Sequence, residues 1–297
     1  MGDSMDDAID GGMDDTTDDI TGNIVAGGVG NTMADGVGNT MDDTTNDAMD
    51  GGTDDSVDDA MTIDKIAKQT SIFITFEGGE GVGKSTQIRL LAARLEASGY
   101  KTRVLRDPGG TVIGEKIRGI LLDTKNAELD SISELLLYEA ARAQLVAEHI
   151  LPALEDGMIV LCDRFTDSTL TYQGVARGLG FDVVKAANKI GSKELVPDRT
   201  IVLTRDVEVA LKRASKNGAD RLESEGIDFH TRVHEAFAAL ALDEPERVRV
   251  VKNQSTKAAT AEFVFGELRD LFPRAADTPF EITPELLQQI KKEKQGE

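Results

Sequence analysis

Short runs of apolar and β-branched residues alternate with longer amphipathic stretches through residues 65–275. One of the longer stretches, Gln87 to Ala97, has clear helical spacing. Strands that alternate with helices are typical of a parallel sheet with helices on both faces. The predicted strands are residues 72–76, 102–106, 158–162, 199–204 and 247–251. The pattern therefore predicts an α/β domain with a five-stranded parallel sheet.

The N-terminal residues 1–64 have no such pattern. They are rich in Asp and Gly, and "GVGNTMAD" at 28–35 recurs almost unchanged at 36–43. Too little apolar surface is available there to offset the entropy of ordering. We predict a disordered low-complexity tail. The run "GGVGNT" resembles calcium-binding glycine-aspartate repeats only faintly, because Thr32 stands where those repeats have aspartate.

The C-terminal residues 276–297 are polar, with one short helical pattern at 283–294. Its apolar positions, Leu286, Leu287 and Ile290, share one side. We expect a loosely docked extension rather than a functional element.

A glycine-rich segment follows the first predicted strand and reads "FEGGEGVGKST". Gly78, Gly83, Lys84 and Ser85 satisfy the pattern G-x-x-x-x-G-K-[ST], in the strand–loop–helix setting that this motif requires. Backbone N–H groups and a helix N-terminus converge there on one anion. We predict a nucleoside triphosphate site, with Lys84 reaching the β- and γ-phosphates and Ser85 offering its hydroxyl to Mg²⁺.

The charge is concentrated in the tail. The chain has a formal net charge of −21, and residues 1–64 contribute 18 Asp and no basic residue, which leaves −3 for the remainder. Such a tail repels nucleic acid. The lack of basic residues near the start argues against a signal or transit peptide, and no apolar run approaches the ~20 residues of a membrane span. A single cysteine, Cys162, permits no intrachain disulfide, and we expect a cytoplasmic protein.

Charged residues follow the other predicted strands, where ligands of parallel sheets bind. Arg106 ends the second strand, and Asp163 and Arg164 follow the third. Two carboxylates, Glu77 and Glu80, lie beside the glycine-rich segment and are costly there unless they hold a cation or a ligand hydroxyl. Asp163 is the expected partner of Mg²⁺.

The segment 212–226 is basic, broken by glycine and suited to a mobile lid. If the acceptor is itself a phosphate, its oxygen is already anionic and needs no general base, so catalysis calls for cations and positioning.

His230 and His234 lack the glutamate of a metalloprotease motif, which favours a surface or packing role.

Five ordered motifs together resemble those of bacterial thymidylate kinases. They are "FITFEGGEGVGKSTQIRLL", "RDPGGT", "LLLYEAARAQL", "DRFTDSTLTYQG" and "DRLE", and the resemblance covers about residues 70–272. It implies a homodimeric, Mg²⁺-dependent enzyme that transfers the γ-phosphoryl group of ATP to dTMP.

The resemblance also implies roles for individual residues. The phosphate loop, which would hold the ATP phosphates, comprises Gly78, Gly79, Glu80, Gly81, Val82, Gly83, Lys84, Ser85 and Thr86. The dTMP site would comprise Glu80, Arg106, Pro108, Tyr138, Arg142, Arg164, Ser168, Tyr172 and Gln173. Ser85 and Asp163 would hold Mg²⁺, and the catalytic cations would be Lys84, Arg106, Arg164, Arg213, Lys216 and Arg221.

Within that site Glu80 would bind the sugar 3′-hydroxyl, while Arg106 and Arg164 would hold the acceptor phosphate through bidentate contacts. Tyr138 would stack on thymine. Arg142, one helical turn later, would hydrogen-bond a thymine carbonyl.

The sequence also departs from the family pattern. Some members carry an arginine in the phosphate loop where this chain has Gly81, so lid residues are expected to supply the cations. Asp107 replaces a glutamate, and Thr204 replaces an aspartate. Thr171 replaces an alanine and would add a hydroxyl near the base.

Other functions fit parts of the pattern. A kinase of another monophosphate is opposed by Tyr138, Arg142 and the pair Tyr172 and Gln173, since a purine needs a larger cavity. A P-loop switch ATPase would leave the arginines after the second and third strands without a purpose. A cation-binding or adhesive role for the acidic tail remains a third alternative.

Overall fold

The computed structural model of the protein describes residues 71–214 and 220–293. The predicted tail, residues 1–64, and the predicted lid residue Lys216 lie outside the described residues. The strands are β1 (Ile72–Glu77), β2 (Thr102–Arg106), β3 (Ile159–Asp163), β4 (Arg199–Thr204) and β5 (Val248–Lys252). The α-helices are α2 (Lys84–Ala97), α3 (Val112–Leu122), α4 (Ser131–Leu145), α5 (Leu151–Glu155), α6 (Thr166–Thr169), α7 (Phe181–Gly191), α8 (Val207–Ala214), α9 (Ile227–Asp243), α10 (Lys257–Gly266), α11 (Pro273–Asp277) and α12 (Pro284–Glu293). Two π-helical segments are η1 (Val146–Ile150) and η2 (Leu170–Ala176).

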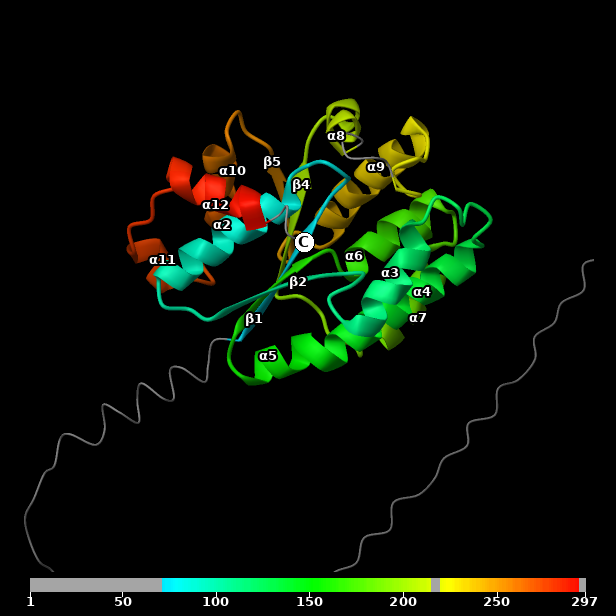
Figure 1. Cartoon of the computed structure of the whole chain (residues 1–297), viewed down its shortest axis with the longest axis horizontal. Coiled ribbons are helices and arrows are strands. Elements are labelled where there is room, and N and C mark those ends of the chain that lie inside the picture. Colours follow the sequence, from blue (N-terminus) through cyan, green and yellow to red (C-terminus); the bar gives the residue numbers. More distant parts are fainter. Residues whose placement is uncertain (1–70, 215–219, 294–297) are drawn as a thin grey trace, which may run out of the picture. The chain divides into compact units, whose positions relative to one another are not determined.

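The five strands pair in parallel in the order β2-β3-β1-β4-β5 (Figure 1). The predicted α/β fold is confirmed, and each strand begins and ends within one residue of its predicted bounds. Because all strands run the same way, their carboxyl ends share one edge. The register sets Phe76 and Arg106 opposite Asp163 there, so the loops after β1, β2 and β3 meet at one place.

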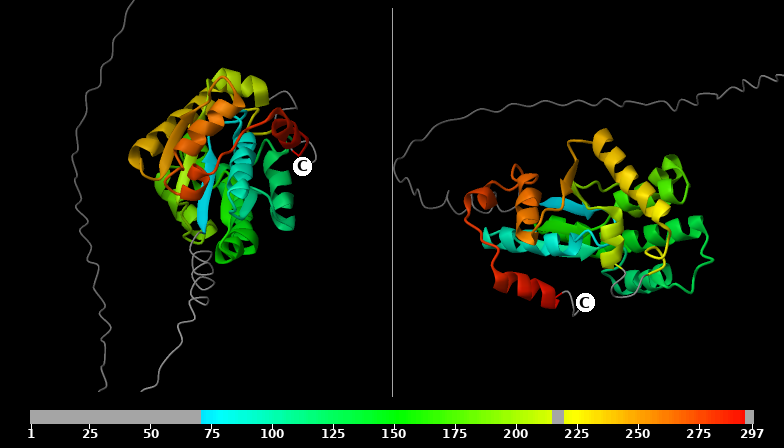
Figure 2. Two further views of the ribbon diagram at one scale, coloured as in Figure 1. Left: turned by 90° about the vertical axis from the view of Figure 1, so that its left-hand side faces the viewer. Right: turned by 90° about the horizontal axis from the view of Figure 1, so that it is seen from above.

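The side chains of β1 show why both faces of the sheet must be covered. Ile74 and Phe76 point to one face and pack with α2 residues such as Leu95, whereas Phe73 points to the other and packs with residues of α4 and η1, including Leu145. A strand that is apolar on both faces is typical of a parallel sheet between helix layers. Figure 2 shows α2 and α9 on opposite sides of the strands.

Two local features shape the edge that carries the loops. Thr111 caps α3 by accepting a hydrogen bond from the Gly114 N–H at 2.8 Å, which fixes the turn after β2. After β3, the short α6 passes directly into η2, which carries Tyr172 and Gln173. π-Helical turns are frequent at functional sites because the extra residue changes which side chains face inward.

The C-terminal helix α12 matches its predicted range closely and lies beside α2 in both views of Figure 2. Ile290 is buried, and Leu286 and Leu287 are partly buried against the same cluster. The helix is therefore packed on the domain rather than loosely docked. No helix among residues 71–214 and 220–293 combines the length and the apolar character needed to cross a membrane.

Leu95→Ala is expected to lower the free energy of unfolding by about 3 kcal/mol, because Leu95 is fully buried between α2 and the sheet. Urea unfolding monitored by circular dichroism measures the change. Leu242→Ala is the matched control, since Leu242 is 84% exposed and its loss should cost less than about 0.5 kcal/mol. Equal effects at the two positions would contradict the assignment of the core.

Candidate active site

The phosphate loop follows a path that glycine alone can take at two positions. Gly78 and Gly81 have φ angles of 119° and 67°. A Cβ atom at Gly78 would lie 2.2 Å from the Leu203 carbonyl oxygen, and one at Gly81 would lie 2.1 Å from the Ala210 carbonyl oxygen. No arginine fits at Gly81 unless the loop or α8 moves. The start of the lid thus packs directly on the phosphate loop.

Lys84 begins α2 and folds back over the loop. Its ammonium group donates hydrogen bonds to the carbonyl oxygens of Gly78 and Gly79, both at 3.0 Å. Burial, followed by the charge of Arg164, lowers the pKa of Lys84. The ammonium group therefore lies at the loop, where an incoming anion can replace two neutral carbonyl contacts.

The first cavity, of about 560 Å³, opens beside the phosphate loop. Six predicted loop residues line it: Glu80, Gly81, Gly83, Lys84, Ser85 and Thr86. Predicted residues from three other loops also line it: Arg106, Asp163, Arg164 and Arg213. Val82 is buried instead, and its carbonyl oxygen accepts a hydrogen bond from Asn253 Nδ2 at 2.9 Å.

Arg164 joins the phosphate loop to the neighbouring helices. Its residue has a φ of 71°, a left-handed conformation that is uncommon outside glycine. The guanidinium donates to the Gly78 carbonyl oxygen at 3.1 Å, to Ser168 Oγ at 3.0 Å and to the Tyr172 hydroxyl at 3.2 Å, and it pairs with Glu80. Burial acts to raise the pKa of Glu80, but the charges of Arg164 and Lys84 and the hydrogen bond from Tyr172 together outweigh it, so the pKa lies below its ordinary value.

Glu77 does not face a ligand, although the sequence suggested that both loop carboxylates do. It is fully buried, and its carboxyl oxygens accept hydrogen bonds from the Phe165 N–H at 2.8 Å and from Ser168 Oγ at 2.6 Å. Burial, with the nearby charge of Asp167, raises the pKa of Glu77 to about 7. The role of Glu77 is to fix the turn that follows β3, between strand and helix.

The second cavity is smaller, about 70 Å³, and shares Glu80, Asp107, Arg118 and Arg164 with the first. Its lining brings together eight of the nine predicted dTMP-site residues: Glu80, Pro108, Tyr138, Arg142, Arg164, Ser168, Tyr172 and Gln173. The ninth, Arg106, lines only the first cavity of these two and pairs with Glu115 at 2.8 Å. Lining residues that sequence reasoning missed include Arg118, Thr169 and Asp220.

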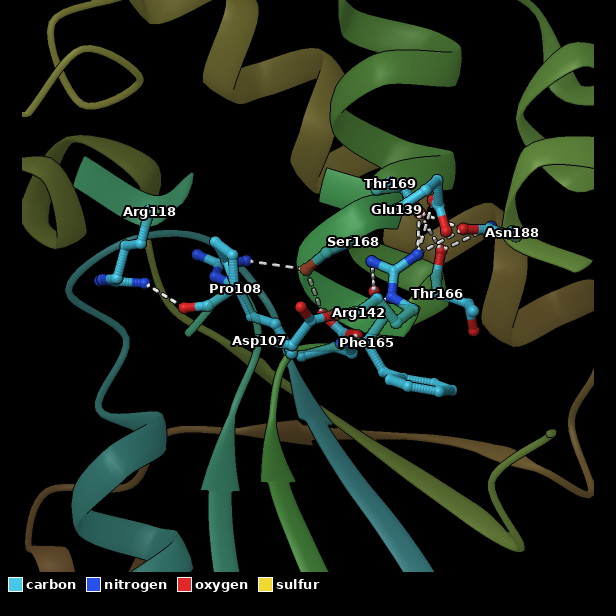
Figure 3. Close-up of polar contacts among 12 residues, drawn as sticks. Asp107, Pro108, Arg118, Glu139, Arg142, Phe165, Thr166, Ser168, Thr169 and Asn188 are labelled. Atoms are coloured by element: carbon cyan, nitrogen blue, oxygen red, sulfur yellow. Dashed lines mark hydrogen bonds and ion pairs between the residues drawn. The ribbon is translucent and has the colours of Figure 1, made fainter. Parts of the chain in front are cut away.

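Arg142 is held by a buried polar network at the second cavity (Figure 3). It donates to Asp107 at 2.6 Å, to Glu139 and Asn188 at 2.7 Å each, and to the Phe165 carbonyl oxygen at 3.2 Å. Burial alone would lower its pKa, but the two carboxylates raise it above the ordinary value. Asp107, the shorter acid at this position, thus reaches Arg142 directly. Of the two N–H groups on Nη2, one donates to no residue that the structure describes.

Arg221 lies away from the phosphate loop, contrary to its predicted place over the phosphates. It is buried, donates to the Leu121 carbonyl oxygen at 2.8 Å and pairs with Glu134 at 2.6 Å. Glu134 also accepts a hydrogen bond from Gln173 at 2.6 Å and pairs with Arg177 at 3.3 Å. In this conformation Arg221 fastens the lid segment to α3 and α4. Of the predicted lid cations, Arg213 lines the first cavity, and Lys216 lies outside the described residues.

Comparisons with known proteins agree with this geometry. The thymidylate kinase family profile matches residues 76–263. The chain belongs to the thymidylate kinase family. It is 52% identical over 175 residues to the thymidylate kinase of Thermoanaerobacter sp. (strain X514), covering 59% of this chain and 86% of that protein. For the enzyme of Caldanaerobacter subterraneus the identity is 47% over 192 residues, covering 65% and 92%.

A solved structure is also similar. The crystal structure of thymidylate kinase from Ehrlichia chaffeensis matches with a TM-score of 0.55 and 33% identity, over 67% of this chain and 99% of that one. The family predicted from five sequence motifs is confirmed.

Two departures from the thymidylate kinase pattern are accommodated within the domain. The Thr171 hydroxyl is buried and donates to the Ser168 carbonyl oxygen at 3.0 Å, across the junction of α6 and η2. The Thr204 carbonyl oxygen accepts a hydrogen bond from Asn253 Nδ2 at 3.0 Å. Asn253 thereby ties the end of β4 to the phosphate loop.

The histidines form no metal site in the part of the chain that the structure describes. His230 lies on the buried side of α9 and is 4% exposed, and burial lowers its pKa. Its placement fits a packing role.

Glu77→Gln is expected to remove a pH dependence of stability. From its ordinary value of 4.5 the pKa of Glu77 rises to about 7 on folding, so between these values the unfolded chain loses its proton first. The free energy of unfolding of the unmodified chain should therefore fall, relative to the variant, by about 3 kcal/mol between pH 4.5 and 7 and stay level above pH 7.

Urea unfolding at half-unit pH steps measures that difference. Gln at position 77 can still accept from Phe165 and can donate to Ser168. Glu285→Gln, at an exposed position, is the control. A difference that stays constant with pH would contradict a neutral buried carboxyl.

Proposed function

We propose that this chain transfers the γ-phosphoryl group of ATP to dTMP, giving ADP and dTDP. The observation that carries the proposal is the pair of adjoining cavities with Arg164 in their common wall. The phosphate loop lines one cavity, and Tyr138 and Arg142 line the other. A second anion site next to the first is what a phosphotransferase needs and a switch ATPase does not.

The donor would bind along the phosphate loop. Loop N–H groups and the N-terminus of α2 suit its phosphates, and Lys84 can exchange its two carbonyl partners for phosphate oxygens. A third cavity, of about 320 Å³, shares Gly83, Thr86, Arg213 and Lys257 with the first and would take the nucleoside of the donor.

The residues present fit a Mg²⁺ ion. Ser85 and Asp163 both line the first cavity, and a hydroxyl and a carboxylate are oxygen donors of the kind that Mg²⁺ accepts alongside phosphate oxygens and water. The ion would neutralise charge on the donor phosphates when bound. Two protein ligands suffice for this, so no larger acidic cluster is required.

The acceptor would bind in the second cavity. Tyr138 lines this cavity and would stack on the pyrimidine, and the remaining N–H of Arg142 Nη2 would donate to a base carbonyl. Arg164 would hold the phosphate between the two cavities, and Arg106 would hold it from the side of the first. Glu80, paired with Arg164 and 3.3 Å from the Tyr172 hydroxyl, is placed for the sugar hydroxyl.

Transfer requires positioning more than proton chemistry. The attacking oxygen of a monophosphate is already anionic, so the arginines bring two polyanions together and stabilise the charge that spreads over the transferred group. Asp220 and Leu222 of the predicted lid line the second cavity and would exclude water, a competing acceptor.

Coupled measurement of ADP release with ATP, Mg²⁺ and a panel of monophosphates (dTMP, dUMP, dCMP, dGMP, UMP and AMP) tests this reaction. We expect preference for dTMP, with kcat/KM for dTMP lowered about 10³-fold by Arg164→Ala, because a buried cation at the acceptor phosphate is lost. Arg269→Ala removes an exposed arginine that lines neither cavity and should leave the rate unchanged. ADP release that does not depend on any acceptor would point to a switch ATPase instead.

We further propose that the chain forms a homodimer through the outer faces of α3 and α4, which pack side by side. Large apolar side chains are exposed there: Ile113 by 50%, Ile120 by 46% and Leu136 by 59%. Exposed large apolar side chains on two adjacent helices favour an interface there.

Leu136→Glu is expected to shift the chain from twice its own mass to the monomer mass, because it places a charge in the apolar contact. Sedimentation velocity over a range of protein concentrations measures this. Leu242→Glu, on exposed α9 surface, should leave the mass unchanged. A chain that is monomeric without any substitution would rule out the interface.

A further inference from the structure

The C-terminal helix α12 lies beyond the residues that the family profile matches, 76–263, yet it is anchored to the domain. Ile290 is 4% exposed and packs with Leu90 of α2 and Ala261 of α10. The anchor is close to the start of α2, where the phosphate loop ends. The helix therefore has a fixed place beside the donor site.

The segment leading into α12 is also held. Phe280 lies in a groove formed by α2 and α10, with its ring centre 5.7 Å from the guanidinium carbon of Arg94. At the start of the helix, Thr283 Oγ1 accepts a hydrogen bond from the Leu286 N–H at 3.2 Å. A stacked aromatic, a side-chain cap and an apolar face together fix the position and rotation of α12.

This rotation brings the last turn of α12 to the first cavity. Ile290 and Lys291 both line it, together with Ser85, Thr86 and Lys257. Lys291 is exposed and makes no ion pair with any residue that the structure describes. Its neighbour Lys292 is equally exposed but does not line the cavity. Of these two lysines, only Lys291 lines the phosphate cavity.

A further cation at the first cavity would stabilise bound phosphate groups. The charge of Arg164 is partly offset by Glu80, and Arg221 pairs with Glu134 and does not line the first cavity. Arg213 is the one predicted lid cation found at the cavity among the described residues. Four further cations line the cavity, and so do four carboxylates: Lys84, Arg106, Arg118 and Lys257, and Glu80, Asp107, Asp163 and Glu223. A bound triphosphate would therefore still be stabilised by one more cation.

We propose that α12 is part of the donor nucleotide site, with Lys291 contacting the triphosphate and Ile290 forming part of the wall beside it. The inference rests on the proposed placement of ATP along the phosphate loop. It assigns to the C-terminal extension a function in the reaction, beyond the part of the chain that matches the family profile.

Isothermal titration of the full chain with ATP in the presence of Mg²⁺ tests the inference. The Kd for ATP should rise about threefold in Lys291→Ala and about tenfold in Lys291→Glu, and these ratios should shrink as NaCl is added. Lys292→Ala and Lys292→Glu are the matched controls and should bind within about twofold of the unmodified chain. In steady-state assays the KM for ATP should rise with little change in the KM for dTMP.

Lys84→Ala separates failure of the inference from failure of the proposed donor site. If Lys84→Ala weakens ATP binding while Lys291→Glu binds ATP like the unmodified chain, α12 has only a structural role and the inference is overturned. If Lys84→Ala binds ATP unchanged, the donor is not on the phosphate loop and the proposed function fails first. Equal weakening by the Lys291 and Lys292 charge reversals would show a general surface effect and would also overturn the inference.

Discussion

The ion pair between Arg164 and Glu80 is the interaction on which the rest of the site depends. One guanidinium contacts the phosphate loop, η2 and the hydroxyl of Tyr172, and it stands in the wall between two cavities. Such a buried cation is tolerable only because a carboxylate and several oxygen acceptors surround it. The same cation remains available to an anion that enters from either cavity.

The acceptor side is organised by a second buried arginine. Arg142 is fixed by Asp107 from the loop after β2, by Glu139 from its own helix and by Asn188 from α7. Because three separate elements contribute, the orientation of Arg142 depends on the assembled domain. A buried polar network of this kind favours one arrangement, since a shift of Arg142 would break its contacts with two buried carboxylates. In the proposed reaction, the remaining N–H of Nη2 would donate to a base carbonyl.

Positive charge reaches the donor side from several directions. Lys84 comes from the phosphate loop, Arg213 from the lid and Lys291 from the C-terminal helix. Gly81 cannot carry a side chain in this backbone, because the Ala210 carbonyl oxygen occupies the space. The contact that excludes an arginine from the loop is thus also the one that places α8 and Arg213 beside it.

The sequence by itself determined the five strands, their parallel arrangement, the phosphate loop and the family. These follow from local signals: apolar runs, glycines where positive φ is required, and motifs in a fixed order. Only the tertiary structure decided the features that depend on contacts between distant parts of the chain. In the structure Arg221 pairs with Glu134 instead of lining the phosphate cavity, Glu77 is buried, and Lys291 lines the donor cavity. The physical reason is that a side chain's partners depend on which distant elements pack against it, and no local pattern records the partner of a buried charge.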